Sequence, residues 1–341
     1  MKPQGPSPRP PAVLPLLLVF YAGFAFAVQN LLIQPVLHHL GPFTVACCRS
    51  SIQLFFASGV ILFKRLIKES FHLLGDTPST SRLLFIRSVF GFLGNIMMLE
   101  AIKRLPIGDA MTLVMLSPIL SSILGVYFLS EPWYLSEMLA AAVSTAGIGL
   151  VSHPTCLIQG DCASASGVVF ALLCALSSAG AFVTIRLLGT VAFVPWYVIA
   201  FTQSLGVLLF SLPFALTMET IDWSGMSAAM AVTVLVAGTM GTSGQFAMTF
   251  GMQQEKSALA SAMRSSDILF GYVLQSVYTS SSPDAQSTAG AGLVVLGMLA
   301  LVLRKQCLDV SEPSVEDGVR DSAEYALVVQ DDPYKDADTI D

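Results

Sequence analysis

The chain has 341 residues, of which 54% are hydrophobic and only 12% are charged, and its mean hydropathy is +0.71. In soluble domains about a quarter of the residues are charged. A soluble fold of this size could not bury so much apolar surface, so the composition indicates a membrane protein. The formal net charge of −6 hides a division, because the segment from Asp309 to Asp341 carries −9 and the remainder carries +3.

The apolar runs predict an all-α membrane protein with ten transmembrane helices. A helix needs about 20 apolar residues to cross the hydrocarbon core of a bilayer, and the runs are separated by short breaks rich in Pro, Gly or charge. The predicted helices cover 13–34, 43–63, 83–102, 107–129, 133–152, 164–188, 193–217, 227–252, 257–279 and 285–303. A short segment, 1–12, precedes them, and an acidic tail, 304–341, follows. The tail is too poor in apolar residues to fold alone, so we predict that it is disordered.

The distribution of Lys and Arg over the connections predicts the orientation of the chain. If the N-terminus is cytosolic, ten of these residues lie on the cytosolic side and only Lys103 and Arg104 on the other. Cytosolic loops of membrane proteins carry such an excess of positive charge. With ten helices, both termini are then cytosolic, in the plasma membrane or an endomembrane.

The six cysteines do not form the pattern of a disulfide framework. Cys47, Cys48 and Cys174 lie within apolar runs, where we interpret them as small packing residues. Cys156 and Cys162 flank a polar loop and could pair if that loop is not cytosolic. The sequence leaves this pairing open.

The two halves of the chain share the same spacing of apolar runs and breaks. When the chain is shifted by 151 residues, 99–154 falls on 250–305 without a gap, and Pro132 meets Pro283. We therefore predict two five-helix repeats, 13–152 and 164–303. Because five is odd, the second repeat would enter the membrane from the opposite side. Two similar halves inserted upside down can expose a central site to each side in turn, as transporters do.

Ionisable residues inside the predicted helices mark a candidate site, because a charge at the centre of the bilayer is unfavourable by about 2.5–3.5 kcal/mol. Arg49 lies about two turns inside its helix, and Gln53 shares its face. Arg87 lies one turn inside the cytosolic end, so it either faces the bundle or extends to the surface. Arg264 and Asp267 share a face near the middle of 257–279, and they either line a cavity or lock helix packing as an ion pair.

Amides in the spans complete the candidate site, because each needs a partner from another helix or from a ligand. The two asparagines of the chain, Asn30 and Asn95, are both intramembrane. Pro118, in the middle of a helix, is expected to produce a kink. The predicted substrate-binding residues are Asn30, Arg49, Gln53, Arg87, Asn95, Gln245, Arg264, Asp267 and Gln275.

The segment Ala101–Pro154 resembles the EamA-type members of the drug/metabolite transporter superfamily. It contains Gly108–Ala110, Pro118, Glu131-Pro132 and a Gly-rich following helix. The segments Ala46–Gln53 and Arg87–Leu99 resemble the G-type branch of the solute carrier 35 family. The resemblance implies ten helices in two repeats, cytosolic termini and a central cavity near Arg49, Arg87, Asn95, Arg264 and Asp267.

These patterns favour a secondary carrier or exchanger of a small polar metabolite. The charged candidate residues within the spans are three arginines and one aspartate. Because positive charge is in excess, we expect an anionic or zwitterionic substrate. The alternatives are a channel and a membrane-embedded enzyme, the latter disfavoured because all four histidines lie in or beside connections. No ATP-binding loop or metal-ligand spacing occurs in the sequence, so we expect no cofactor, no metal and no nucleic-acid partner. Whether the chain forms a homodimer is left open.

Overall fold

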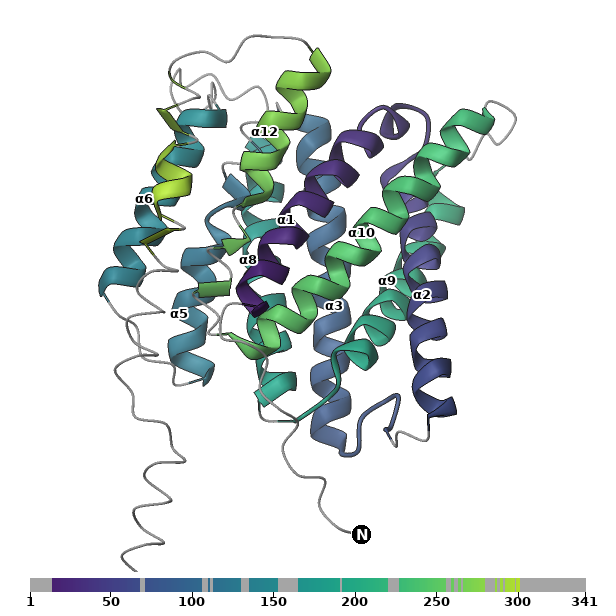
Figure 1. Cartoon of the computed structure of the whole chain (residues 1–341). Helices are drawn as coiled ribbons and strands as arrows, with labels where there is room; N and C mark the ends of the chain where they lie inside the picture. Colours follow the sequence, from purple (N-terminus) through teal and green to yellow (C-terminus); the bar gives the residue numbers. More distant parts are fainter. Residues whose placement is uncertain are drawn as a thin grey trace, which may run out of the picture. The chain divides into compact units, whose positions relative to one another are not determined.

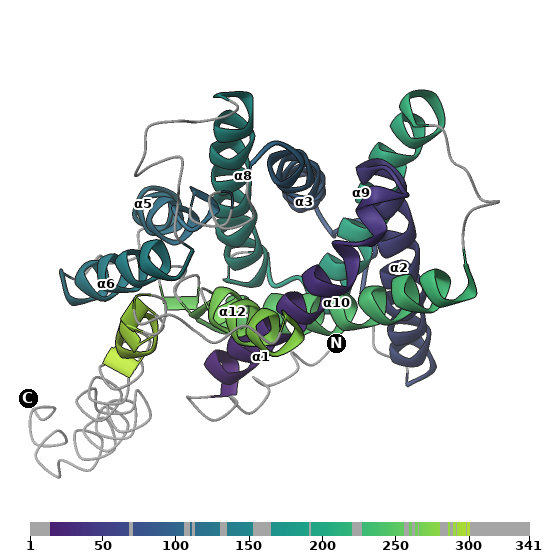
Figure 2. The same ribbon diagram turned by 90° about the horizontal axis from the view of Figure 1, so that it is seen from above.

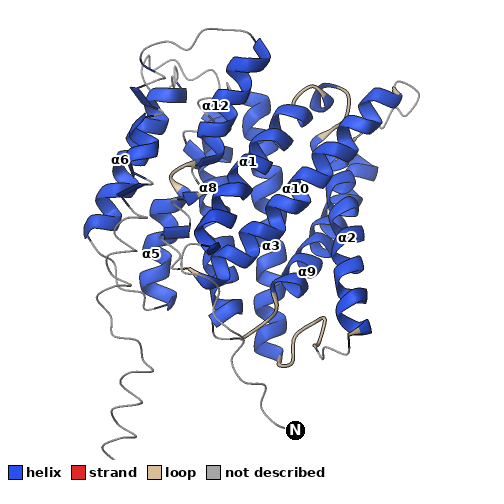
Figure 3. Ribbon diagram, viewed as in Figure 1, coloured by secondary structure: helices blue, strands red, loops and turns tan. Residues whose placement is uncertain are grey.

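The described part of the chain in the computed structural model is helical, without a strand (Figure 3). It comprises residues 14–67, 71–105, 110, 113–129, 135–152, 165–190, 192–219, 227–255, 259–260, 263–264, 266–279, 286, 289–290, 292–297 and 299–300. Segment 1–12, tail 304–341 and the cysteines Cys156 and Cys162 lie outside these residues, so what the sequence predicts for them stays a prediction.

The helices follow the apolar runs of the sequence. With the labels of Figure 1, they are α1 (Leu14–Ile33), the short 3-10 helix η1 (Val36–His38), α2 (Pro42–Leu66), α3 (Pro78–Arg104), α5 (Ser117–Leu129), α6 (Leu135–Ser152), α8 (Ala165–Thr190), α9 (Trp196–Met218), α10 (Ala228–Gln254) and α12 (Ser266–Thr279). Among the described helices, α1, α2, α3, α8 and α9 are long and apolar enough to cross a membrane, and α5 is a shorter apolar helix. Each of those five begins and ends within five residues of a predicted span.

Local signals set where several helices begin. Thr77 precedes α3, and its hydroxyl accepts a hydrogen bond from the Thr80 backbone N–H at 3.2 Å. Ser227 does the same at the start of α10, with the N–H of Met230 at 3.2 Å. Such caps satisfy N–H groups that have no partner within the helix. Pro residues at the first position of α2 and α3 add a backbone angle that already suits a helix.

A carboxylate from a distant segment caps α2. Glu219, at the end of α9, accepts hydrogen bonds from the N–H groups of Phe43 at 2.9 Å and Thr44 at 2.8 Å. The hydroxyl of Thr44 donates a third, at 2.7 Å. A Cβ atom at Gly41 would lie 2.0 Å from the carboxyl carbon of Glu219, so a larger residue there would displace this carboxylate. The Phe43 and Phe214 rings stack beside it, 5.1 Å apart. This junction fixes α2 against α9.

Helices from the two halves of the sequence pack together. α1 runs beside α10 and has α12 along its other side (Figures 1 and 2). α3 packs on α8, α2 packs on α9, and α5 packs on α8. A shift of 151 residues places 14–33 within α8, 42–66 onto α9, 78–104 onto α10 and 117–129 onto α12. Under this shift the pair α1–α10 becomes α8–α3, and α5–α8 corresponds to α12–α1. The packing is therefore reciprocal between the halves.

Two predicted spans are interrupted. The span predicted over 107–129 contains a turn at 115–116, where the N–H of Leu116 bonds to the carbonyl of Leu113 at 3.2 Å, and α5 follows. The span predicted over 257–279 contains a turn at Arg264, where the N–H of Asp267 bonds to the Arg264 carbonyl at 3.3 Å. A shift of 151 residues superimposes these two bonds. The kink expected at Pro118 is thus a turn just before it.

Candidate functional site

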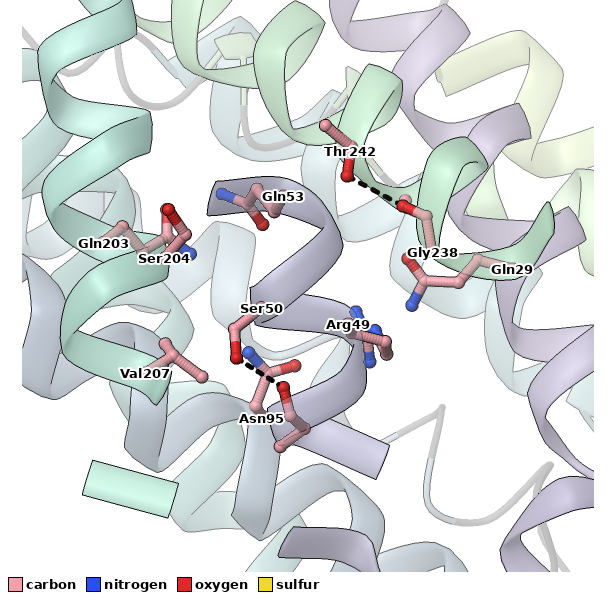
Figure 4. A pocket seen from close by; sticks show the side chains of 12 residues that line it. Gln29, Arg49, Ser50, Gln53, Asn95, Gln203, Ser204, Val207, Gly238 and Thr242 are labelled. Carbon is pink, nitrogen blue, oxygen red and sulfur yellow. Dashed lines mark hydrogen bonds between the residues drawn. The ribbon is translucent and has the colours of Figure 1, made fainter. Parts of the chain in front are cut away.

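A pocket lies between α1, α2, α3, α9 and α10 (Figure 4). It encloses about 20 Å³, room for about one water molecule, so the surrounding helices would have to move apart to admit a larger solute. Its wall is formed by Gln29, Ala46, Arg49, Ser50, Gln53, Asn95, Gln203, Ser204, Val207, Gly238, Gly241 and Thr242. The wall is polar and has no acidic residue.

Arg49 is the charged residue of this wall. It extends from α2, the helix that Glu219 caps, and Gln53 follows it one turn later. Within the described ranges, no Asp or Glu lies at ion-pair distance from its guanidinium. A cation without a counter-ion inside a helix bundle is unfavourable. The positive charge of Arg49 is therefore not balanced by an acidic residue of the pocket wall.

The hydroxyls of the wall turn their oxygens to the pocket. Ser50 donates to the Ala46 carbonyl at 2.7 Å, and Thr242 donates to that of Gly238 at 2.8 Å (Figure 4). Ser204 likewise donates to a carbonyl of its own helix, at 2.9 Å. Each hydroxyl has a single hydrogen to donate, so these three present lone pairs rather than donors to a ligand.

A hydrogen-bonded group of amides and one arginine lies behind the α9 side of the pocket. Arg87 of α3 donates through Nη2 to Gln203 Oε1 at 2.7 Å, and Gln245 Nε2 of α10 donates to the same oxygen at 2.9 Å. Gln245 Nε2 also donates a hydrogen bond to the hydroxyl oxygen of Thr249, at 3.2 Å. Arg87 is only 1% exposed, and its Nε and Nη1 atoms have no hydrogen-bond partner among the described residues. The side chain of Arg87 thus faces the bundle and does not extend to the surface.

A second charged group lies apart from the pocket wall, at the start of α12. Arg264 Nη1 donates to Asp267 Oδ2, and the guanidinium stands 4.5 Å from the centre of the Phe26 ring on α1. Asp267 is 6% exposed. Gly23 of α1 allows the close contact, since a Cβ there would lie 2.1 Å from Ser266 Oγ. This ion pair therefore joins α12 to α1.

The structure brings five of the nine predicted site residues to the pocket or directly behind it. Arg49, Gln53 and Asn95 line it, whereas Arg87 and Gln245 hold Gln203 from behind. The remaining four are placed elsewhere or are not described. Arg264 and Asp267 pair with each other, Asn30 is half-buried on α1 outside the lining, and the side chain of Gln275 lies outside the described part. Their role in binding stays a prediction.

Some wall residues were absent from the predicted set. Gln203 and Ser204 lie in the apolar run of α9, and Gln29 precedes Asn30 on α1. A lone amide within an apolar span was the available signal for Gln203, because such a group requires a partner. Its partner, Arg87, is 116 residues away in the sequence, so the pairing itself was not visible.

Other charged residues behave as expected for a surface. Glu100 contacts Arg104, and its carboxylate lies 3.7 Å from Lys103 Nζ, at the exposed end of α3. The three residues therefore form a charge cluster at that end of the helix. Within the described ranges, no group of three or more His, Cys, Asp or Glu residues is placed to hold a metal ion.

Apolar helices of membrane-spanning length around a polar pocket define an integral membrane protein. Comparison with known families agrees with this class. A sequence model of the EamA-like transporter family matches residues 13–153 and again 165–303, so the chain belongs to the EamA-like transporter family.

Two of the similar proteins are, by name, a solute carrier and an exporter. Solute carrier family 35 member G1 of Mus musculus is 24% identical over 88% of this chain and 82% of its own length. The pseudopaline exporter CntI of Pseudomonas aeruginosa is 25% identical over 85% of this chain and 96% of its own length. A crystal structure that is 18% identical has a TM-score of 0.71 and matches 86% of this chain and 98% of that one. This last likeness concerns the fold alone.

Proposed function

We propose that the protein is a secondary transporter that carries a small polar metabolite, anionic or zwitterionic, by alternating access. The pocket that contains Arg49 is its substrate site. In this proposal ten transmembrane helices form two inverted repeats, 13–152 and 164–303, and both termini are cytosolic.

The observation that carries the proposal is Arg49 without a counter-ion in a pocket without acids. A bound anion would supply the missing counter-charge to Arg49, which is partly withdrawn from solvent. Asn95 and Gln53, with the hydroxyl oxygens of the wall, would hold the polar remainder of the substrate.

Reciprocal packing supports the inverted repeats. The pairs α1–α10 and α3–α8 exchange under the shift of 151 residues, whereas α2–α9 maps onto itself. A pseudo-two-fold axis within the membrane plane would produce this pattern. The matching turns at 113–116 and 264–267 add to it, because interrupted helices at corresponding positions of two halves are typical of transporters.

The names of the relatives support movement of solutes across a membrane. One is a solute carrier and another an exporter of pseudopaline. From these names we infer only the class of process, and we infer no substrate from them.

The direct test is counterflow in proteoliposomes with a panel of labelled small acids, amino acids and sugars. We expect saturable exchange of at least one acid, and a loss of about tenfold or more in Arg49→Ala, in line with the loss of a charge-assisted contact. Arg82→Ala, which changes an exposed arginine at the start of α3, is the matched control and should retain exchange. Equal exchange by Arg49→Ala and the wild type would refute the assignment of the site.

Topology offers an independent test. Tags at the two ends of the chain should both be protected in sealed cells and both become accessible when the plasma membrane is permeabilised. If one tag is accessible from outside or from a lumen while the other is cytosolic, the helix count is odd, and the inverted repeat is wrong.

A further inference from the structure

Arg87 does not line the pocket, yet it lies directly behind a residue that does. We propose that Arg87, acting through Gln203, makes the α9 wall of the pocket a hydrogen-bond donor, and that the pocket selects small organic acids with an acceptor group at each end. This inference rests on the proposed function and specifies the substrate class of the same site.

The first step is the orientation of the Gln203 carboxamide. A guanidinium has only donors, so the group that faces Arg87 must be the oxygen of Gln203 and not its nitrogen. Gln245 Nε2 donates to the same oxygen, and the two donors occupy both of its lone pairs. The two N–H bonds of Gln203 therefore remain for another acceptor.

The second step is that these N–H groups have access to the pocket. Gln203 lines it, and within the described part its Nε2 atom forms no hydrogen bond. The Nε2 atom of Gln203 is also not fully buried. The fully buried polar atoms without a partner include two nitrogens of Arg87 but not this one. A ligand in the pocket can therefore accept from Gln203.

The third step is the charge behind the amide. No acid among the described residues pairs with Arg87, so its positive potential is not cancelled locally. In a buried site this potential polarises the carboxamide and strengthens donation from the opposite end. An ammonium group at that end of a ligand would instead meet N–H donors and a nearby cation.

The fourth step is the opposite side of the pocket. In Figure 4, Gln203 and Ser204 lie on one side, and Arg49 and Gln29 on the other. A ligand that reaches both sides meets a cationic donor at one end and a polarised amide donor at the other. Carboxylates or carbonyl oxygens at both ends satisfy this arrangement, as in small dicarboxylates and oxo acids.

Two probes of similar length separate this class from the zwitterions. Succinate carries a carboxylate at each end, whereas γ-aminobutyrate carries one carboxylate and one ammonium. In proteoliposomes of the wild type we expect succinate to be taken up with a KM about tenfold or more below that of γ-aminobutyrate, the difference of one charge-assisted contact.

The decisive variant is Gln203→Glu, which replaces the amide group with a carboxylate and keeps the size of the side chain. One carboxylate oxygen can still accept from Arg87 and Gln245, so the variant should unfold at the same temperature as the wild type or a higher one. The other oxygen now presents an acceptor to the pocket. We expect the preference to reverse, with γ-aminobutyrate favoured over succinate.

Ser211→Ala is the matched control in α9. Its hydroxyl is buried without a hydrogen-bond partner, so both KM values should stay at those of the wild type. An unchanged preference in Gln203→Glu overturns the inference and leaves transport intact. Unfolding of that variant also overturns it, because the ion pair with Arg87 would not have formed. A wild type that exchanges other solutes but neither probe overturns the substrate class alone, whereas no exchange of any solute refutes the proposed function.

Discussion

Arg87 and Arg264 are both arginines inside the helix bundle, but their surroundings differ. Arg264 has a carboxylate partner, Asp267, three residues away on the same segment. Among the described residues Arg87 has one partner, the amide of Gln203 on α9, and the same amide oxygen also accepts from Gln245 on α10. The first arrangement is neutral and local, whereas the second leaves a net charge and joins α3, α9 and α10.

The difference separates a packing role from an electrostatic role. An ion pair cancels its own field at a distance, so Arg264 with Asp267 contributes little potential to the pocket and instead joins the interrupted helix to α1. An arginine whose partner is a neutral amide, as Gln203 is for Arg87, keeps its field. Variants of the two groups should therefore change different observables, stability in one case and substrate preference in the other.

The largest effect on stability is expected for Asp267→Asn. The change keeps the shape of the side chain but leaves Arg264, which is partly buried, without its counter-charge; loss of one partner of a buried pair destabilises by up to about 3–5 kcal/mol. Denaturation in detergent micelles would measure it. Asp76→Asn is the control, since Asp76 is exposed and lies 3.9 Å from His72, and such surface pairs contribute about 0–1 kcal/mol.

The first repeat suggests how to restore the stability that Asp267→Asn loses. Leu113 and Leu116 occupy the positions equivalent to Arg264 and Asp267 and form the same backbone hydrogen bond. The double variant Arg264→Leu/Asp267→Leu should thus be at least as stable as the wild type, since buried ion pairs can often be replaced by apolar side chains without loss. A double variant as unstable as Asp267→Asn would show that the pair does more than fill this turn.

Arg87→Met tests the other half of the comparison. It removes a buried cation that no acid compensates and keeps a long side chain, so the free energy of unfolding should change by only about 1 kcal/mol, with either sign. Substrate preference should change more, because Gln203 loses the donor that fixes its orientation. We expect the KM for succinate to rise by about tenfold, measured by uptake. A large loss of stability with unchanged KM would assign Arg87 to packing.

The sequence predicted the long helices well because they are continuous apolar runs. It predicted 13–34 where α1 spans 14–33, and 43–63 where α2 spans 42–66. The turn at 115–116 was not predicted as a break, since its residues are as apolar as the rest of the span. Hydropathy reports the surroundings of side chains and is insensitive to a change in backbone hydrogen bonding.

The site was predicted in the same uneven way. Arg49 and Asn95 were found because a charge or amide inside a span requires an explanation. Asn30 was chosen although its neighbour Gln29 lines the pocket. Successive residues of a helix point about 100° apart, and a nearly uniformly apolar helix such as α1 does not reveal which of them faces the centre. That rotation is fixed by contacts with α10 and α12, which only the fold supplies.

The smallest effect is expected for Gln245→Leu, which removes the neutral donor and keeps the charged one. Stability should fall by about 1 kcal/mol, the usual contribution of one hydrogen bond. Arg87 still holds the Gln203 oxygen at 2.7 Å, and bonds from charged donors are about twice as strong as neutral ones. The succinate KM should therefore rise by only about threefold, less than in Arg87→Met. If the two variants raised the succinate KM equally, the orientation of Gln203 would depend on the presence of both donors rather than on the charge of Arg87. The contrast between Arg87 and Arg264 would then lose its electrostatic basis.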